Sequence, residues 1–181
     1  MGKKAIELVQ AGGLNVDDVL KDLNRAYCDE WLAYHAYKHM AEVVSGPAYE
    51  DMQEFLEKTA DNELEHTEEL AARITELGGV TIANPGDFEK NANYPYPAIP
   101  QRTDDYSGII DLVTKSEAQA MEVYEKLIKK TMGKDNDTYQ LISHIQGEEV
   151  AHEERFANLL STGQKEKTAH AKKTPEPAGV R

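Results

Sequence analysis

The apolar stripes of this 181-residue chain are interrupted by glutamates at positions where helical spacing predicts core residues. Two of these glutamates are followed three residues later by a histidine. The interrupting residues are Glu30, Glu63, His66, Glu117, Glu149 and His152. Removing a carboxylate from water costs several kcal/mol unless the charge is paired, and four carboxylates in one core repel each other. A fold that joins these stripes therefore favours divalent cations between the carboxylates.

The first two stripes predict a helical hairpin. Asn15 is a typical N-cap, the apolar spacing after it is helical, and the run stops at Gly46. Pro47 suits the first position of the next helix, because it lacks only an N–H that would be unpaired there anyway. Gly78 and Gly79 end this second helix. The connection is so short that the two helices must run antiparallel.

The segment from Gly79 to Asp104 breaks the helical pattern. It contains four prolines in 26 residues, so most of it is predicted to be extended. A loop this long needs a reason, and a crossover along helices of about 45 Å lets the second and third helices run parallel. A third helix is predicted up to Gly133 and a fourth from Asn136-Asp137. The predicted fold class is all-α, a four-helix bundle with up-down-down-up topology and a long crossover between helices two and three.

Both predicted hairpins place their glutamates at matching depths. Glu30 lies 16 residues before Gly46, and Glu63 lies 16 residues after Pro47, so both sit about 24 Å from the turn. In the second hairpin, the two glutamates lie 16 residues on either side of Gly133. Because residues i and i+3 of a helix share a face, each Glu-x-x-His can hold one ion. The alternative is that these glutamates are surface acids of an acidic chain. Surface acids would have no reason to lie at matching depths in both hairpins.

These motifs resemble the ferritin superfamily, and in particular the bacterioferritins and the Dps-like proteins, over residues 15–160. The stretches that carry the resemblance are LNRAYCDEWLAYHAY, ELEHTEELAARITELGG and SEAQAMEVYEKL. The resemblance implies a di-iron carboxylate site within one subunit, whereas ordinary Dps proteins place theirs between subunits with a different motif. It implies three ligands for each iron, with Glu63 and Glu149 bridging the pair. The two sets are Glu30, Glu63 and His66 for one iron, and Glu117, Glu149 and His152 for the other.

The function implied by this resemblance is that of a ferroxidase. Such a protein oxidises Fe(II) with hydrogen peroxide or oxygen, stores ferric mineral in a hollow shell and limits oxidative damage. The resemblance favours a dodecameric homo-oligomer first and a 24-subunit shell second, with iron as the metal and manganese as the alternative. Two other functions stay open, a non-storing di-metal peroxidase or catalase-like enzyme and a DNA-protecting Dps-type shell. Six ligands around two ions leave positions open for an oxidant, which favours redox chemistry over a closed structural site.

The sequence lacks three features of the related families, and each missing feature excludes a cofactor or a cysteine motif. Bacterioferritins take a haem ligand from a methionine directly after the helix-two glutamate, and this position is Leu64, so no haem is expected. Many Dps-like proteins carry a cysteine pair, one member of which follows the helix-three glutamate, where this chain reads Glu117-Ala118-Gln119. The single cysteine, Cys28, can form neither that pair nor the Cys-x-x-Cys module of rubrerythrins.

Other residues near the stripes have a functional and a structural interpretation. Tyr37 and Tyr124 each follow a proposed ligand by seven residues, so they lie two turns along its stripe. They are candidates for electron transfer or, alternatively, for core packing with a hydrogen-bonded hydroxyl. Glu148 projects about 100° away from its neighbour Glu149. We interpret it as a solvated acid, with a supporting role beside the metal or in iron access as the alternative.

Charge divides the chain into two expected parts. The net charge is −13, and residues 161–181 carry +3, which leaves −16 for residues 1–160. We expect a ferritin-like bundle over 1–160 and a disordered basic tail over 161–181. The acidic body favours cations over nucleic acid, so DNA binding by the tail is not expected. Because the chain shows neither a long apolar run nor a signal peptide, we expect no membrane partner and a cytoplasmic location.

Overall fold

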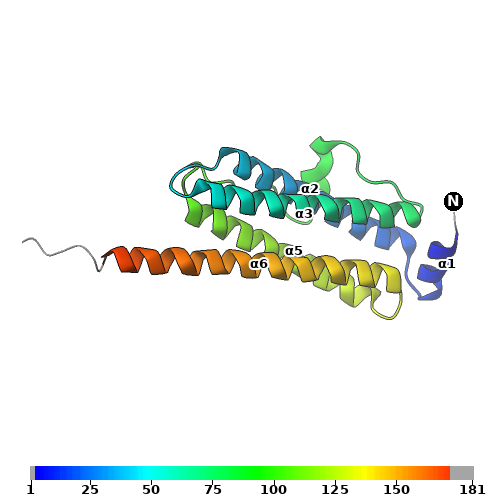
Figure 1. The fold of residues 1–181 in the computed structure, drawn as a ribbon. Coiled ribbons are helices and arrows are strands. Elements are labelled where there is room, and N and C mark those ends of the chain that lie inside the picture. The colour runs from blue at the N-terminus through cyan, green and yellow to red at the C-terminus, as the bar shows by residue number, and fades with distance from the viewer. Residues whose placement is uncertain (1–2, 172–181) are drawn as a thin grey trace, which may run out of the picture.

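Four long helices form the body of the molecule in a computed structural model that describes residues 3–171, with side chains described up to residue 158. They are α2 (Val16–Val43), α3 (Tyr49–Glu76), α5 (Tyr106–Thr131) and α6 (Asn136–Ala171). The hairpin of α2 and α3 lies against the hairpin of α5 and α6 (Figure 1). Within the described range every regular element is a helix, and none is long and apolar enough to cross a membrane. The predicted all-α bundle is confirmed.

The helix ends follow the capping and turn residues of the sequence. The Asn15 side chain caps α2 by accepting a hydrogen bond from the backbone N–H of Asp18. Gly78 follows the end of α3 with φ +80°, and Gly133 separates α5 from α6 with φ +69°. Both glycines adopt the left-handed conformation that residues with a Cβ avoid. These turns keep each hairpin tight, so glutamates at equal distances from a turn meet at one level.

The start of α3 differs from the prediction. Pro47 was expected at its first position, but α3 begins at Tyr49. The reason is Ala48, whose φ of +56° is left-handed and therefore breaks the helix before it reaches the proline. Pro47 lies in the loop instead, where its carbonyl oxygen accepts a hydrogen bond of 2.9 Å from the hydroxyl of Tyr106. This contact ties the first hairpin turn to the start of α5.

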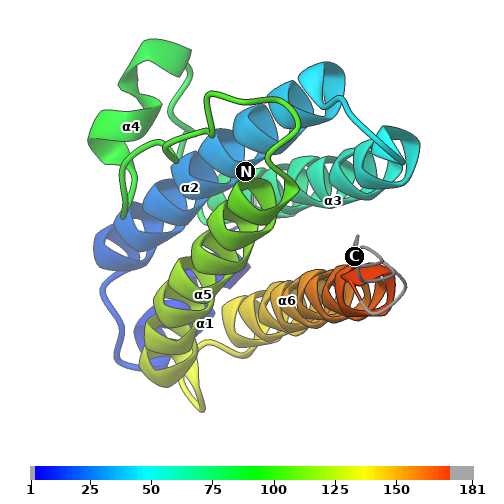
Figure 2. The ribbon, with the colours of Figure 1, turned by 90° about the vertical axis from the view of Figure 1, so that its left-hand side faces the viewer.

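The crossover between α3 and α5 contains helical structure that proline content did not predict. A 3₁₀ turn, η1 (Pro85–Asp87), leads into the short helix α4 (Phe88–Asn91). The Phe88 ring is buried against Cys28 and Leu32 of α2, so α4 covers the outer face of that helix (Figure 2). Burial also raises the pKa of the Cys28 thiol to about 11. A helix of four residues is too short to show an apolar period, so α4 could not be recognised from hydrophobic spacing.

Two further helical segments extend the fold beyond the predicted elements. The N-terminal helix α1 (Lys4–Ala11) was not predicted, and it buries Val9 against the bundle. At the other end, α6 continues to Ala171, so the expected boundary at residue 160 falls within this helix. Residues 161–171 include Lys, Gln, Glu and Ala, which favour helix, and no proline follows residue 160 before Pro175. Residues 172–181 of the expected tail lie outside the described part of the chain.

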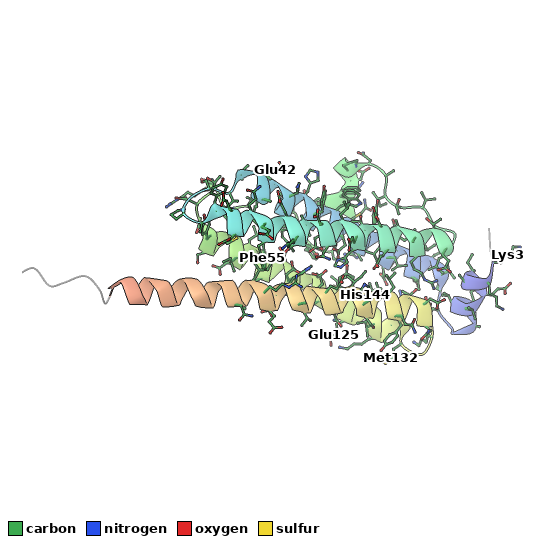
Figure 3. The ribbon with its side chains drawn as sticks, in the orientation of Figure 1. Lys3, Glu42, Phe55, Glu125, Met132 and His144 are labelled. Atoms are coloured by element: carbon green, nitrogen blue, oxygen red, sulfur yellow. The ribbon has the colours of Figure 1, made fainter. Side chains whose placement is uncertain are left out.

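Two apolar clusters of the bundle core lie on either side of a polar layer, apart from the smaller cluster around Phe88 described above. One cluster includes Tyr37, Leu56 and Phe156, and the other includes Leu23 and Ile145. Phe55 of α3, labelled in Figure 3, packs against the first cluster. Its ring centroid lies 4.3 Å from that of Phe156 on α6. The apolar clusters hold all four helices in fixed contact above and below the polar layer, which is what positions its side chains.

Candidate metal centre

The six residues singled out by the sequence pattern meet in this polar layer. All four long helices contribute, and each of the six residues is at most 2% exposed. They are Glu30 from α2, Glu63 and His66 from α3, Glu117 from α5, and Glu149 and His152 from α6. The predicted proximity and burial of these side chains are therefore present in the structure, whereas their role as metal ligands stays a prediction.

The six residues form two overlapping groups of potential ligands. Within each group, one donor atom from each residue lies within 4.8 Å of the others. The first group is Glu30, Glu63, His66 and Glu149, and the second is Glu63, Glu117, Glu149 and His152. Glu63 and Glu149 belong to both groups. This overlap is the geometry expected when two carboxylates bridge two ions.

The donor atoms of the layer fit a pair of divalent cations. Among the described side chains, the buried atoms without a hydrogen-bond partner include Glu63 Oε1, Glu117 Oε2, Glu149 Oε1 and His152 Nδ1. Leaving a buried polar atom unpaired costs about 1–3 kcal/mol. Carboxylate oxygens and imidazole nitrogens are ligands for iron and manganese. Two cations between the helices would satisfy all four atoms.

Burial and mutual repulsion shift the ionisation of the carboxyls. Burial, followed by the charge of Glu149, raises the pKa of Glu63 and of Glu117 well above the ordinary range. Burial also acts to raise the pKa of Glu149, but its polar contacts with Glu117, His152 and His66 outweigh burial and lower that pKa. Without metal, the layer therefore carries fewer negative charges than its four glutamates suggest.

The two histidines hold protons in the metal-free layer. Burial acts to lower the pKa of His152, but the carboxylates of Glu117 and Glu149, 3.5–3.7 Å from its Nδ1, raise that pKa to about 9. The pKa of His66 is raised in the same way, against burial, by its hydrogen bonds with carboxylates. Metal ligands must be deprotonated. Protons thus occupy the place of the cations and must leave when metal binds.

Two tyrosines support the carboxylates from opposite helices. The Tyr37 hydroxyl of α2 donates a hydrogen bond of 2.8 Å to Glu117 Oε1 on α5. The Tyr124 hydroxyl of α5 donates a hydrogen bond to Glu30 Oε1 on α2. Burial, followed by the neighbouring carboxylates, raises the pKa of both phenols well above 10, so both remain neutral donors. The sequence placed both tyrosines near the site but did not show this reciprocal pairing.

A third tyrosine, Tyr94 of the crossover, was missed by sequence reasoning. It lines a cavity of about 10 Å³ together with Glu30, Glu63 and Glu149, and it also lines an outer cleft of about 490 Å³. It therefore separates the polar layer from a surface cleft between α2 and α5. The sequence did contain one indication of Tyr94, namely an aromatic residue inside a long proline-rich loop. A crossover between parallel helices explains the length of this loop but not the aromatic residue in it.

Asp29 fixes the segment that carries this tyrosine. Its carboxylate accepts a hydrogen bond of 2.6 Å from the backbone N–H of Asn93 and another from the Asn93 side chain. Asp29 is 2% exposed, and burial raises its pKa to about 7 although these hydrogen bonds oppose the rise. The residue next to Glu30 thus holds the crossover against the polar layer.

Comparison with known proteins places the chain in a family. Residues 20–165 match the model of the ferritin-like domain. The chain belongs to the ferritin-like domain family. A DNA protection during starvation protein of Pyrococcus furiosus is 30% identical over 154 residues, which are 85% of this chain and 83% of that protein.

Solved structures of ferritin-like proteins show the same architecture. The bacterioferritin-related protein of Bacteroides fragilis, described as a dodecameric thioferritin, is 31% identical with a TM-score of 0.87, covering 93% of this chain and 98% of that chain. Dps of Thermosynechococcus elongatus is 20% identical with a TM-score of 0.73, covering 80% of this chain and 90% of that chain. The second likeness shows the shared fold alone.

Proposed function

We propose that this ferritin-like protein is a ferroxidase that binds two Fe(II) ions in the polar layer, oxidises them with hydrogen peroxide or oxygen, and stores the ferric product. The observation that carries the proposal is the pair of buried ligand groups that share Glu63 and Glu149. Two Fe(II) ions supply the two electrons that reduce one peroxide molecule to water. A mononuclear site would need a second turnover to supply them.

The side chains around the site have distinct tasks in this proposal. Glu63 and Glu149 bridge the ions, while the hydroxyls of Tyr37 and Tyr124 hold the carboxylates of Glu117 and Glu30 in place. The protons held by the metal-free layer leave as the ligands bind. The apolar clusters on both sides keep bulk water away from the site.

A shell is part of the proposed function because storage needs an enclosed space. The dodecameric thioferritin of Bacteroides fragilis covers nearly the whole chain in the structural comparison, which supports a dodecamer. The acidic body, with a net charge of −16 over residues 1–160, suits the uptake of cations. Storage is what distinguishes this function from that of a non-storing di-metal peroxidase.

Iron loading tests whether the protein stores iron. We expect purified protein, supplied with Fe(II) and limiting peroxide, to retain many more than two iron atoms per subunit after desalting. The physical reason is that oxidised iron must leave the paired site for the site to turn over. Iron analysis combined with light scattering of the assembly measures the ratio. A ratio that stops at two per subunit would support the peroxidase function instead.

DNA protection is a second candidate because of the Pyrococcus furiosus relative. The segment 161–181 has the basic composition to bind phosphates, but its net charge of +3 adjoins a body of −16. Repulsion of phosphates by the body acts within a Debye length of about 10 Å at 0.1 M salt. Several tails on one shell would strengthen a weak contact through effective concentration.

A gel-shift titration decides the role of this segment. We expect little DNA retardation by the full chain at near-physiological salt, and no change when the chain is cut before Ser161. Iron oxidation should be unaffected by the truncation, because all six proposed ligands precede residue 161. Tight binding by the full chain that survives near-physiological salt and disappears on truncation would establish DNA binding by the tail.

A further inference from the structure

The two halves of the polar layer are related by an internal repeat, but the surroundings of their two histidines differ. Each histidine turns its Nδ1 toward the carboxylates. His66 Nδ1 lies 3.2–3.4 Å from Glu30, Glu63 and Glu149, and His152 Nδ1 lies 3.5–3.7 Å from Glu63, Glu117 and Glu149. The tyrosine hydrogen bonds described above are also reciprocal. Neither feature distinguishes the two halves.

The outer nitrogen of the imidazole ring does distinguish them. His66 Nε2 lies 2.9 Å from Glu148 Oε2, within hydrogen-bond distance. Among the described side chains, the carboxylates within 4.0 Å of His152 all approach its Nδ1. From sequence, Glu148 is interpreted as a solvated acid. On the described part of the chain, however, it is the one carboxylate that contacts the outer nitrogen of either His66 or His152.

The repeat shows which residue takes the place of Glu148 in the other half. Glu148 directly precedes the bridging Glu149 on α6, and Asn62 directly precedes the bridging Glu63 on α3. Asn62 is partly buried, as Glu148 is. An amide carries no charge, so it cannot accept a charge-assisted hydrogen bond from an imidazole as a carboxylate does. The repeat is therefore broken at this pair of positions.

We propose that Glu148 is a positioning residue that makes the ion position of Glu30 and His66 the tighter of the two. This inference rests on the proposed di-metal function. A carboxylate that accepts the outer N–H of a ligating histidine fixes the tautomer and orientation of the ring and makes the other nitrogen more basic. Among the described side chains, a carboxylate supports His66 in this way and none supports His152. The first ion should therefore bind on the Glu30 side and the second on the Glu117 side.

An anaerobic titration with Co(II) tests the inference without turnover. The measurements are calorimetry for affinity and visible absorption for the geometry of the bound ion. We expect the full-length protein to bind two Co(II) ions per subunit in two distinct steps. Glu117→Ala should keep the tight step and lose the weak one, while Glu30→Ala should do the reverse. These two variants assign the steps to the halves.

Exchanging the residue types at positions 62 and 148 provides the sharpest comparison. Glu148→Gln should weaken the tight step by about 10–100-fold and leave the weak step unchanged. Asn62→Glu should tighten the weak step, and the double variant should reverse the order of filling. Glu154→Gln, an exposed acid on the same helix, is the matched control and should change neither step. The side chain of Glu148 is 37% exposed, so its replacement does not disrupt the core.

The outcomes separate the inference from the function on which it rests. Two ions bound with equal affinity in the unmodified protein, or a tight step that Glu148→Gln leaves intact, would overturn the role of Glu148 and leave the di-metal site standing. Failure of the unmodified protein to bind Co(II) would overturn the di-metal function itself. Reversal of the two steps by the double variant would establish the inference, because a merely structural effect would weaken both.

Discussion

Replacing Glu63 with alanine is expected to abolish rapid Fe(II) oxidation. Glu63 belongs to both ligand groups, so its loss removes a donor from each ion position at once. Removing even an outer partner of a metal ligand costs about 10–100-fold in affinity or activity, and a shared ligand should cost more. Stopped-flow absorbance with two Fe(II) per subunit measures the rate. A near-normal rate would contradict the site assignment.

Two comparisons show that this loss does not come from misfolding. Glu65→Ala removes an exposed acid from the same helix two residues away and should leave the rate unchanged. The metal-free Glu63→Ala protein should melt no lower than the unmodified metal-free protein. The reason is that burial raises the pKa of Glu63, so the folded state disfavours its charged form. Lost activity with retained thermal stability is thus the expected pair of results.

Metal is expected to stabilise the protein, and increasingly so as the pH rises from about 6 to about 9. In the metal-free protein, the pKa values of Glu63 and Glu117 are raised well above 4.5 and that of His152 is raised from 6.5 to about 9. The folded state then binds more protons than the unfolded state, so stability falls as the pH rises through this range. Glu149, whose pKa is lowered, acts in the opposite direction only at acidic pH.

Bound metal reverses this dependence because it requires deprotonated ligands. A cation that binds only the folded state stabilises it by RT ln(1 + [L]/Kd), and competition with protons weakens binding at low pH. Thermal melts with and without Mn(II), or with Fe(II) under anaerobic conditions, should therefore separate more at pH 8.5 than at pH 6. Melting temperatures that metal leaves unchanged at both pH values would mean that these side chains do not bind it.

The sequence was sufficient for the four-helix bundle and for the meeting of its glutamates. Helical periodicity and capping are local, so the stripe that includes Glu30 can be recognised without knowing its neighbours. The number of residues between each glutamate and the hairpin turn can also be read from the sequence. In an antiparallel hairpin, two residues separated from the turn by the same number of residues lie at the same level along the helices. The bridging arrangement of Glu63 and Glu149 came from family resemblance and stays a prediction, while the structure places both residues in each group of close donor atoms.

The tertiary structure alone decided which side chains meet across helices. Whether the hydroxyl of Tyr37 reaches Glu117 or a neighbour depends on the rotation and axial offset of packed helices, which periodicity does not contain. The same offset brings Glu148 to His66, although its direction on α6 suggested solvent. Tyr94 was hidden for a further reason, since its loop has no period and the segment beside it is held by a tertiary contact, the hydrogen bonds between Asn93 and the buried carboxylate of Asp29. Local spacing thus determined the ligand candidates, and packing determined how they are supported.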